Sequence, residues 1–323
     1  MVEVIRLNAP GGPEQLERAD IELAPPSPDE VRIRQTAVGV NFLDIYQRQG
    51  LYALPQAIPG VEGVGLITAV GDNVSPTRIG ERIAYAGAPV GAYAAERNLP
   101  AWRAVPLPAM LTDEAVASLF LKAITAQMLL QRVYPVARGD TVLVHSAAGG
   151  LGQLLVRWAS HLGATVIGTV GSEAKAEVAR QAGAHHVIVG RDADFAAEVS
   201  VSTEGRKADY AIDGVGGTTL AKTLACVRPF GVVASIGQAA GPIPPIAVDE
   251  LGPQRSLLLG RPSVMGYVNN REDYRAAAEA VLSLMQQGVL AAATKPYALR
   301  DAAQAHADLE AGRTTGSVVL VPS

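Results

Sequence analysis

Two patterns of hydrophobic positions divide the chain. In the first third, short strand-like stretches are separated by turns. VRIRQTAVGV at 31–40 alternates between apolar and polar residues over its first positions, whereas GVEGVGLITAVGD at 60–72 is rich in glycine and β-branched residues, and ERIAYAGAPVGAYAAERNL at 81–99 is similar. Alternation with a period of two is typical of strands that bury one face. Proline and glycine separate these stretches densely, which favours an irregular, mostly antiparallel β domain.

From about Thr112 the pattern predicts helices and parallel strands. A helix is expected over 111–134 with Thr112 as its N-cap. Apolar runs without alternation are typical of parallel strands covered on both faces, and they occur at 141–147, 164–171, 185–189, 208–215 and 231–237. Helices are expected between the first of these strands, at 149–163 and at 172–183, the second capped by Ser172. This rhythm predicts an α/β fold with a doubly wound parallel sheet.

The end of the chain returns to the first pattern. A helix is expected at 271–288 and a closing strand at 316–322. Because this strand has no obvious place in the parallel sheet, we assign it to the first domain.

Composition narrows the classes of function. A length of 323 residues suits two domains. The net charge is −4 with the signs mixed along the chain, which argues against a nucleic-acid partner or a membrane anchor. The single cysteine, Cys226, excludes an internal disulfide, and the N-terminus lacks the apolar core of a signal peptide. We therefore expect a cytoplasmic protein.

The most specific local signal is a glycine-rich turn between a predicted strand and a predicted helix. Its spacing is Ala147-x-Gly149-x-x-Gly152, with alanine where the general dinucleotide-binding pattern has its first glycine, which indicates a slightly wider turn. Glycines allow backbone N–H groups and the helix N-terminus to approach a pyrophosphate closely. Gly149, Gly150, Leu151 and Gly152 are thus candidate cofactor-binding residues, the alternative being a plain strand–turn–helix corner.

The end of the second parallel strand bears on the choice of cofactor. NAD sites usually place an acid there to bind the ribose 2′-hydroxyl, whereas this segment contains Thr169, Gly171 and Ser172. Lys175 follows closely and Arg191 comes after the third strand, and both are able to meet a 2′-phosphate. This pattern favours NADPH, although Glu173 has the wrong sign if it faces the phosphate.

The sequence predicts no metal. A catalytic zinc site needs three Cys, His or carboxylate ligands. One cysteine excludes a thiolate cluster, and none of the five histidines lies in the first 140 residues, where the ligands of a substrate domain would lie. His145 is expected to be a packed residue or a neighbour of the cofactor.

The motifs together resemble a known group, the medium-chain dehydrogenase/reductase superfamily, and most closely its zinc-free quinone oxidoreductases, the ζ-crystallin-like branch. The resemblance runs along essentially the whole chain. Zinc relatives carry Gly-His-Glu where this chain has Gly60-Val61-Glu62. The most specific blocks are NFLDIYQRQGLY (41–52), PGVEGVGLITAVGDNV (59–74), GAYAAERN (91–98), LFLKAITA (119–126), HSAAGGLG (145–152), RPSVMGY (261–267) and RTTGSVVLVP (313–322).

The resemblance implies a GroES-like β-rich substrate domain at 1–122 and 266–323, a Rossmann NADPH-binding domain at 123–265, and a homodimer. It also implies roles for individual residues. Asn41, Tyr46 and Tyr52 would contact the acceptor, while Asp44, Lys122 and Thr125 would orient the nicotinamide. Relatives often have a tyrosine near the adenosine end where this chain has Gly190. The residues that would close over the nicotinamide end are Ile236, Gly237, Gln238, Arg261 and Ser317.

Two of these assignments have structural alternatives. Phe42, Tyr46 and Tyr52 lie within eleven positions of a chain that is only 5% aromatic, so we expect the tyrosines to line the ring of an acceptor. The alternative for Tyr46 is core packing with its hydroxyl bonded to backbone. Lys122 lies in an apolar stretch and needs a partner if buried, and Asp44 is a candidate. The alternative is a lysine that reaches the surface.

We therefore predict an NADPH-dependent enzyme that reduces a quinone or another small electrophile without a metal. One alternative is an alkenal or enoyl reductase on the same scaffold, which must also protonate the α-carbon and so needs a positioned tyrosine or water. Another is a non-catalytic relative that binds NADPH or RNA.

Overall fold

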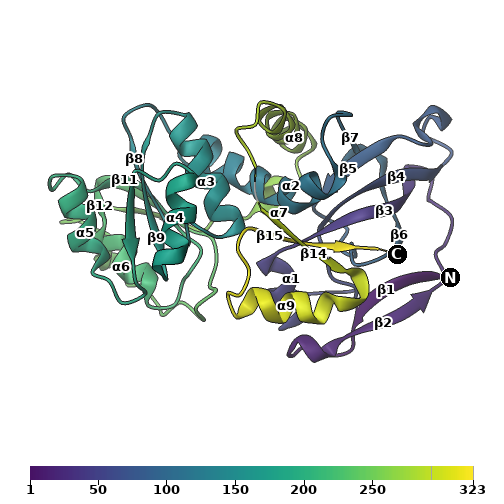
Figure 1. Ribbon diagram of the computed structural model, residues 1–323, viewed down its shortest axis with the longest axis horizontal. Helices are drawn as coiled ribbons and strands as arrows, with labels where there is room; N and C mark the ends of the chain where they lie inside the picture. Colours follow the sequence, from purple (N-terminus) through teal and green to yellow (C-terminus); the bar gives the residue numbers. More distant parts are fainter. Residues whose placement is uncertain (292, 323) are drawn as a thin grey trace. The chain divides into compact units, whose positions relative to one another are not determined.

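The computed structural model describes residues 1–291 and 293–322 and contains two compact units, Met1–Ile124 with Met265–Ser323, and Thr125–Val264 (Figure 1). The chain passes between them twice. On the way out it forms α2 (Asp113–Gln127), and on the return it forms the single turn α7 (Val264–Tyr267). The Thr112 hydroxyl accepts the Ala115 N–H at 3.3 Å, which confirms the predicted N-cap. The α-helix ends earlier than predicted and continues as a π-helix, Met128–Val133.

The first unit is built on a seven-stranded sheet. Its order is β14-β15-β3-β4-β5-β7, with β6 also paired to β3. All pairings are antiparallel except that of β14 with β15, which confirms a mostly antiparallel domain. The strands are β3 (Glu30–Val40), β4 (Glu62–Val70), β5 (Arg82–Ala86), β6 (Glu96–Pro100), β7 (Val105–Pro106), β14 (Thr294–Ala298) and β15 (Ser317–Val321).

Smaller elements complete this unit. β1 (Val2–Leu7) and β2 (Leu16–Ile21) form a separate antiparallel pair, and α1 (Phe42–Arg48) follows β3 directly. The other helices are α8 (Arg271–Gln286) and α9 (Ala302–Glu310). The final strand, β15, pairs with β3 as predicted, so the last residues of the chain complete a sheet that begins near residue 30. Apolar side chains of both ends of the chain, Ile33 and Leu320 among them, share one core.

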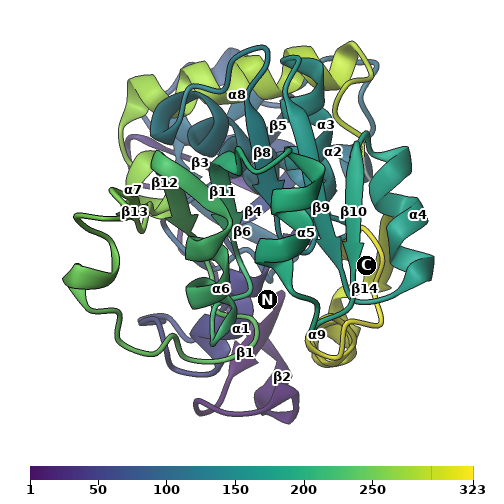
Figure 2. The same cartoon turned by 90° about the vertical axis from the view of Figure 1, so that its left-hand side faces the viewer.

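The second unit contains a six-stranded parallel sheet in the order β10-β9-β8-β11-β12-β13 (Figure 2). Every residue of β8 and of β11 is buried, as expected for strands covered on both faces. The strands are β8 (Thr141–Val144), β9 (Thr165–Val170), β10 (His186–Val189), β11 (Ala208–Asp213), β12 (Val227–Ser235) and β13 (Leu258–Gly260). Helix α3 (Gly150–His161) packs beside α4 (Glu173–Gln181), and α5 (Phe195–Ser202) packs beside α6 (Thr219–Ala225). The strand order reverses between β8 and β11, and ligands of doubly wound sheets bind at such a point, beyond the carboxyl ends of the strands.

Within the described residues, each helix is too short or too polar to span a lipid bilayer.

Candidate active site

The glycine turn lies at the carboxyl end of β8, where the strand order reverses. Gly149 is the N-cap of α3, no side chain caps this helix, and the Gly149 N–H bonds to the Ser146 carbonyl at 2.8 Å. A Cβ at Gly152 would press into the same Ser146 oxygen, so only glycine allows α3 to pack this closely on the turn. The N–H groups of the first helical turn have no acceptor within the helix and are available to an anion. Gly149, Gly150, Leu151 and Gly152 therefore form a cradle that fits a pyrophosphate.

Positive charge flanks the end of β9. A Cβ at Gly171 would lie 3.6 Å from the Arg191 Nε, so this guanidinium lies beside Gly171. Lys175 is half-buried in the first turn of α4, whereas Glu173 is exposed. Ser172 occupies the N-cap position as predicted, but its side chain makes no capping hydrogen bond. With no acid at the end of the strand, these residues fit a phosphate on the ribose better than a free 2′-hydroxyl.

The backbone conformation explains why this chain has Gly190 where relatives often have a tyrosine. Gly190 has φ of +113°, a conformation that residues with a side chain rarely adopt. A tyrosine at this position would be strained, so this turn after β10 excludes the aromatic contact that relatives often make there.

The side chains of Thr169 and His145 are hydrogen-bonded to each other in the interior of the second unit. The Thr169 hydroxyl lies 2.9 Å from His145 Nδ1, and the Thr223 hydroxyl lies 2.8 Å from His145 Nε2. Burial lowers the pKa of His145, although nearby Asp213 opposes this. His145 is thus a packed, neutral residue that links β8, β9 and α6, and the Thr169 side chain is committed to it.

The predicted residues that follow β12 and β13 lie at the same edge of the sheet. Ile236, Gly237 and Gln238 follow β12, and the Ile236 N–H bonds to the Asp213 carbonyl at 2.8 Å. Arg261 follows β13 and donates from Nη1 to the Ser235 hydroxyl at 3.1 Å. Thr125 lies on α2, three residues after Lys122.

In the first unit, the candidate acceptor residues gather on and beside α1. Asn41 is the N-cap of this helix. The Tyr46 ring is buried, and its centroid lies 6.2 Å from that of Phe42 and 5.9 Å from that of Tyr52, which is exposed. The three aromatic rings therefore form one cluster with a buried base and an accessible side.

Ser317 lies at the same end of the sheet as Asn41. Val318 pairs with Val40, the residue before Asn41, in the antiparallel register of β15 and β3. The Ser317 hydroxyl is buried and has no hydrogen-bond partner among the described residues. A buried hydroxyl without a partner is costly, which is consistent with a group that a ligand satisfies.

Asp44, in the first turn of α1, is fully buried. Its Oδ2 accepts the Asn41 backbone N–H at 2.8 Å and the Tyr93 hydroxyl at 3.1 Å, and the Tyr93 hydroxyl also lies 2.8 Å from His306 Nε2. Burial raises the pKa of Asp44 to about 7, with the bond from Asn41 opposing and nearby Glu62 adding to the rise. Burial and the charge of Arg48 lower the pKa of His306 to about 3.

The proposed pairing of Lys122 with Asp44 is wrong. Lys122 Nζ lies 3.5 Å from Glu62 Oε1 and donates to the Ser118 carbonyl at 3.1 Å. Only 12% of the Lys122 side chain is exposed, which favours a lysine held within the protein over one that extends into solvent. Asp44 is instead bonded to the N-cap of α1 and to Tyr93.

Glu62 is the residue that sequence reasoning missed. It is fully buried at the start of β4 and accepts the Asn41 Nδ2 N–H at 2.8 Å as well as the Leu121 backbone N–H at 2.7 Å. Its signal in the sequence was an acid inside an apolar, glycine-rich run predicted to be a buried strand. A buried carboxylate requires partners, and these turn out to be two of the predicted site residues or their neighbours.

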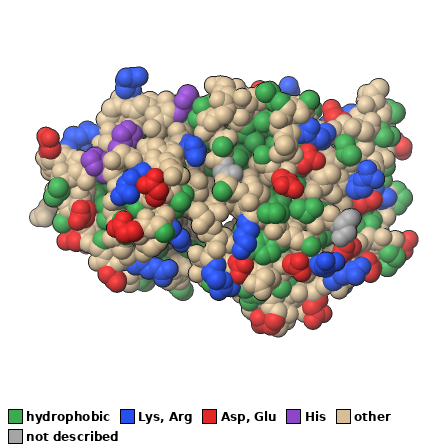
Figure 3. Space-filling view, viewed as in Figure 1, with side chains coloured by type: hydrophobic (Ala, Val, Ile, Leu, Met, Phe, Trp, Pro, Cys, Tyr) green, Lys and Arg blue, Asp and Glu red, His purple; other side chains and the backbone are tan. Residues whose placement is uncertain are grey.

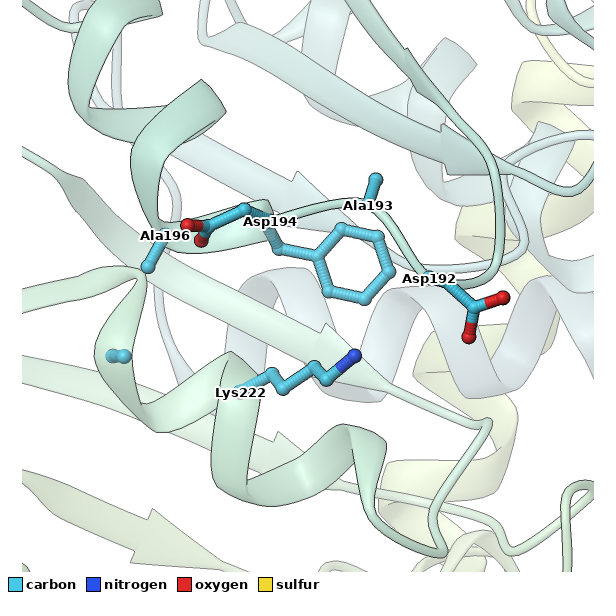
Figure 4. Close-up of a pocket in the computed structure, with 7 residues that line it drawn as sticks. Asp192, Ala193, Asp194, Ala196 and Lys222 are labelled. Carbon is cyan, nitrogen blue, oxygen red and sulfur yellow. The ribbon is translucent and has the colours of Figure 1, made fainter.

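Each unit has a pocket among its described residues. The first, of about 300 Å³, is lined by Tyr52 and Gln47 together with Leu7, Asn8, Ala9, Pro10, Gly50, Ala53, Leu54 and Ala57. The second, of about 340 Å³, lies between α5 and α6 and contains none of the predicted site residues (Figure 4). There the Lys222 ammonium lies 5.7 Å from the centre of the Phe195 ring, and Asp192 and Asp194 also line the pocket. No group of three or more His, Cys, Asp or Glu side chains able to hold a metal occurs among the described residues.

Comparison with known proteins agrees with this geometry. Residues 27–109 match a family model described as an alcohol dehydrogenase GroES-like domain, and residues 150–283 match one described as a zinc-binding dehydrogenase. A 2-haloacrylate reductase of a Burkholderia species is 40% identical over 100% of this chain and 99% of its own. A quinone oxidoreductase of Pseudomonas aeruginosa is 40% identical over all of both chains. The crystal structure of an Escherichia coli quinone oxidoreductase complexed with NADPH is 36% identical, covers 99% of both chains and superposes with a TM-score of 0.93.

Proposed function

Since this chain belongs to the quinone oxidoreductase branch of the medium-chain dehydrogenase/reductase superfamily, we propose that it is an NADPH-dependent reductase of small quinones. The observation that carries the proposal is the cradle at Gly149–Gly152, where any side chain at Gly152 would collide with the Ser146 carbonyl. This glycine allows α3 to pack closely on the turn, which brings the N-terminus of α3 to the carboxyl end of β8, where dinucleotide-binding folds hold a pyrophosphate.

The second unit would hold the cofactor. The N–H groups of Gly150, Leu151 and Gly152, beside Gly149, bind the pyrophosphate. Lys175 and Arg191 beside Gly171 bind the 2′-phosphate, with the Ser172 hydroxyl as a further donor. The Ile236–Gln238 loop and Arg261 lie at the same edge of the sheet and, with Thr125 of α2, bind the remainder of the cofactor. Thr169, whose hydroxyl bonds to His145, is no longer assigned to it. In the first unit, Ser317, Asp44 and Lys122 serve its nicotinamide end.

The acceptor would lie against α1. Bound NADPH supplies the hydride, so the protein needs chiefly to orient the acceptor and to exclude water. Tyr46 and Tyr52 offer aromatic faces to a planar ring, and Asn41 donates a hydrogen bond to an acceptor oxygen. No metal takes part in this scheme.

A second candidate is reduction of an activated C=C bond. The 2-haloacrylate reductase is as similar to this chain as the P. aeruginosa quinone oxidoreductase, which favours this reaction as the alternative. Protonation of the α-carbon would then require a positioned donor, and the exposed Tyr52 hydroxyl is able to serve. Tyr52→Phe is expected to abolish most alkene reduction but to reduce quinone turnover only slightly.

The direct test is the loss of absorbance at 340 nm with NADPH or NADH against a panel of quinones and α,β-unsaturated carbonyls. Quinone-dependent oxidation of NADPH in preference to NADH is expected. Oxidation with the alkenes alone would replace the quinone proposal with the alternative, and no binding of either nucleotide would refute both. Lys122→Ala is expected to raise the KM for NADPH, and an unchanged KM would exclude Lys122 from the cofactor site.

We propose that two copies of the chain form a homodimer through the edge of the parallel sheet. Strand β13 is the last strand on this side of the sheet, and Leu258 on it is 52% exposed. Phe230 and Val248 of the same unit are also exposed. An open edge with apolar side chains favours pairing with a second strand. Light scattering after gel filtration should give twice the mass of 33.5 kDa, and a monomer mass would contradict the proposal.

The distribution of charge argues against a nucleic-acid partner. On the face shown in Figure 3, basic and acidic side chains are interspersed, and the net charge is −4. An RNA-binding role would call for a basic stripe or patch. We therefore do not propose the RNA-binding alternative, and salt-dependent retention of RNA in a gel shift would contradict this choice.

A further inference from the structure

Glu62 connects two helices that both carry candidate site residues. Its Oε1 accepts the Asn41 side-chain N–H at the start of α1, and its Oε2 accepts the Leu121 backbone N–H within α2. Lys122, the next residue of α2, places its ammonium 3.5 Å from Oε1. The carboxylate itself is fully buried, so it does not contact a ligand directly.

These contacts determine how Asn41 is turned. A carboxylate only accepts hydrogen bonds, so the Asn41 amide must face it with nitrogen and not with oxygen. One N–H of the Asn41 amide is committed to Glu62 at 2.8 Å. The second N–H is the donor that this side chain can still offer, and its direction is set by the first.

The same carboxylate determines the place of the Lys122 ammonium. A lysine ammonium has three N–H groups, and the Lys122 ammonium lies within reach of Glu62 and of the Ser118 carbonyl. An ammonium that is only slightly exposed requires a counter-charge nearby, and the only ion pair found for Lys122 among the described residues is the one with Glu62. The charge of Glu62 therefore holds Lys122 in place.

The backbone beside Glu62 prevents the carboxylate from moving aside. A Cβ at Gly39, on β3, would collide with both Glu62 Oε1 and the Ala117 carbonyl. Strand β3 thus passes so close to the carboxylate that no side chain fits between them. Glu62 is confined between a strand and a helix.

We propose that Glu62 is a positioning residue, which acts through Asn41 and Lys122 to prepare the nicotinamide and acceptor side of the site. The inference rests on the function proposed above. Its consequence is specific: neutralising Glu62 should weaken NADPH binding and raise the KM for the acceptor, because the ammonium loses its counter-charge and the amide loses its acceptor.

The test compares Glu62→Gln with Glu310→Gln. Glu310 is a suitable control because it also makes an ion pair in the first unit, with the buried Arg48 of α1 at 2.7 Å, although Glu310 itself is partly exposed. It contacts neither Asn41 nor Lys122. The measurements are the dissociation constant of NADPH from a fluorescence titration without acceptor, the KM for a quinone, and the melting temperature.

We expect Glu62→Gln to weaken NADPH binding by about tenfold or more, the effect of losing one charged hydrogen bond. Glu310→Gln should lower the melting temperature but leave the dissociation constant within about twofold of the wild type, a change too small to correspond to a lost hydrogen bond. Equal effects of both variants on binding, or an unchanged constant in Glu62→Gln, would show a purely structural role and overturn the proposal. A wild-type protein that does not bind NADPH would refute the proposed function instead.

A second pair of variants serves if Glu62→Gln does not fold. Lys122→Met removes the charge that Glu62→Gln leaves unpaired. The double variant that combines Glu62→Gln with Lys122→Met is therefore compared with Lys122→Met alone. A further rise in the KM for the acceptor is expected in the double variant, because Asn41 also loses its partner. No further rise would overturn the proposal.

Discussion

Replacing Asp44 by asparagine should change how the stability of the first unit depends on pH. The Asp44 carboxyl is fully buried, and burial raises its pKa from an ordinary value of 3.8 to about 7. Between these two values the folded protein holds a proton that the unfolded chain releases. Stability contributed by this group is therefore lost as the pH rises from about 4 to 7.

The size of the effect follows from the two pKa values. Between pH 5 and pH 8, ionisation of Asp44 should cost the folded state about 3 kcal/mol. Asparagine retains an oxygen that can accept the Asn41 N–H and the Tyr93 hydroxyl, but it does not ionise. The free energy of unfolding of Asp44→Asn, minus that of the wild type, should rise by this amount across the same range.

His306 contributes with the opposite sign. Its pKa is lowered to about 3 in the folded protein, so the stability it contributes is lost as the pH falls below its ordinary value of 6.5. Because His306 is present in both proteins, its contribution cancels in the difference. The comparison therefore isolates Asp44.

The assay is urea unfolding at pH 5 and pH 8, followed by the fluorescence of Trp102 in the first unit. The other tryptophan, Trp158, belongs to the second unit and is replaced by phenylalanine in both proteins, so that the signal reports one unit only. A difference between Asp44→Asn and its parent that does not change with pH would refute the argument. It would mean that Asp44 is already ionised at pH 5 and that its hydrogen bonds offset burial.

Three further predictions concern stability and binding. Gly152→Ala should destabilise the second unit by about 1–3 kcal/mol and abolish NADPH binding, because the added methyl group meets the Ser146 carbonyl. Gly149→Ala, whose added methyl group has its nearest contact at 3.2 Å, should lower the stability less. Equal melting temperatures of the two variants would contradict this. Burial would raise the pKa of Asp209, but the Thr141 N–H and two arginines lower it overall. Asp209→Asn should therefore cost about 2 kcal/mol at pH 7 in urea unfolding, and the difference should shrink as the pH falls below 4; a pH-independent difference would argue against a lowered pKa. Ser317→Ala should leave the melting temperature unchanged or higher, because the buried Ser317 hydroxyl has no partner among the described residues. The same variant should weaken NADPH binding about fivefold in a titration. Unchanged binding would remove Ser317 from the cofactor site.

Much of the fold was predictable because it follows from local patterns. Uninterrupted apolar runs predicted the parallel strands, and their complete burial in β8 and β11 is the physical reason for that pattern. Strand β14 was missed, since Pro296 argues against a strand, and the structure accommodates it at the edge of the sheet, where one N–H is not needed. The early end of α2 was missed as well, because a π-helical segment has the same apolar composition as the helix before it.

Part of the candidate site could also be predicted from local sequence, and part of it could not. The glycine turn was visible in the sequence, because its chemistry requires glycines at a fixed spacing next to a strand and a helix. The partner of Lys122 was not, because Glu62 and Asp44 are both acids at a distance in the chain. Only packing decides that Glu62 meets α2 while Asp44 turns toward Tyr93 and His306.

The sequence by itself therefore determined the two classes of sheet, the dinucleotide turn and the lack of a cysteine cluster, since each is a property of neighbouring residues. Only the tertiary structure decided which buried charges face one another and which buried hydroxyls, that of Ser317 among them, are left without a partner in the described part of the chain. The physical reason is that burial and pairing depend on segments far apart in the chain, such as β4, α1 and α2, that meet only when the core closes.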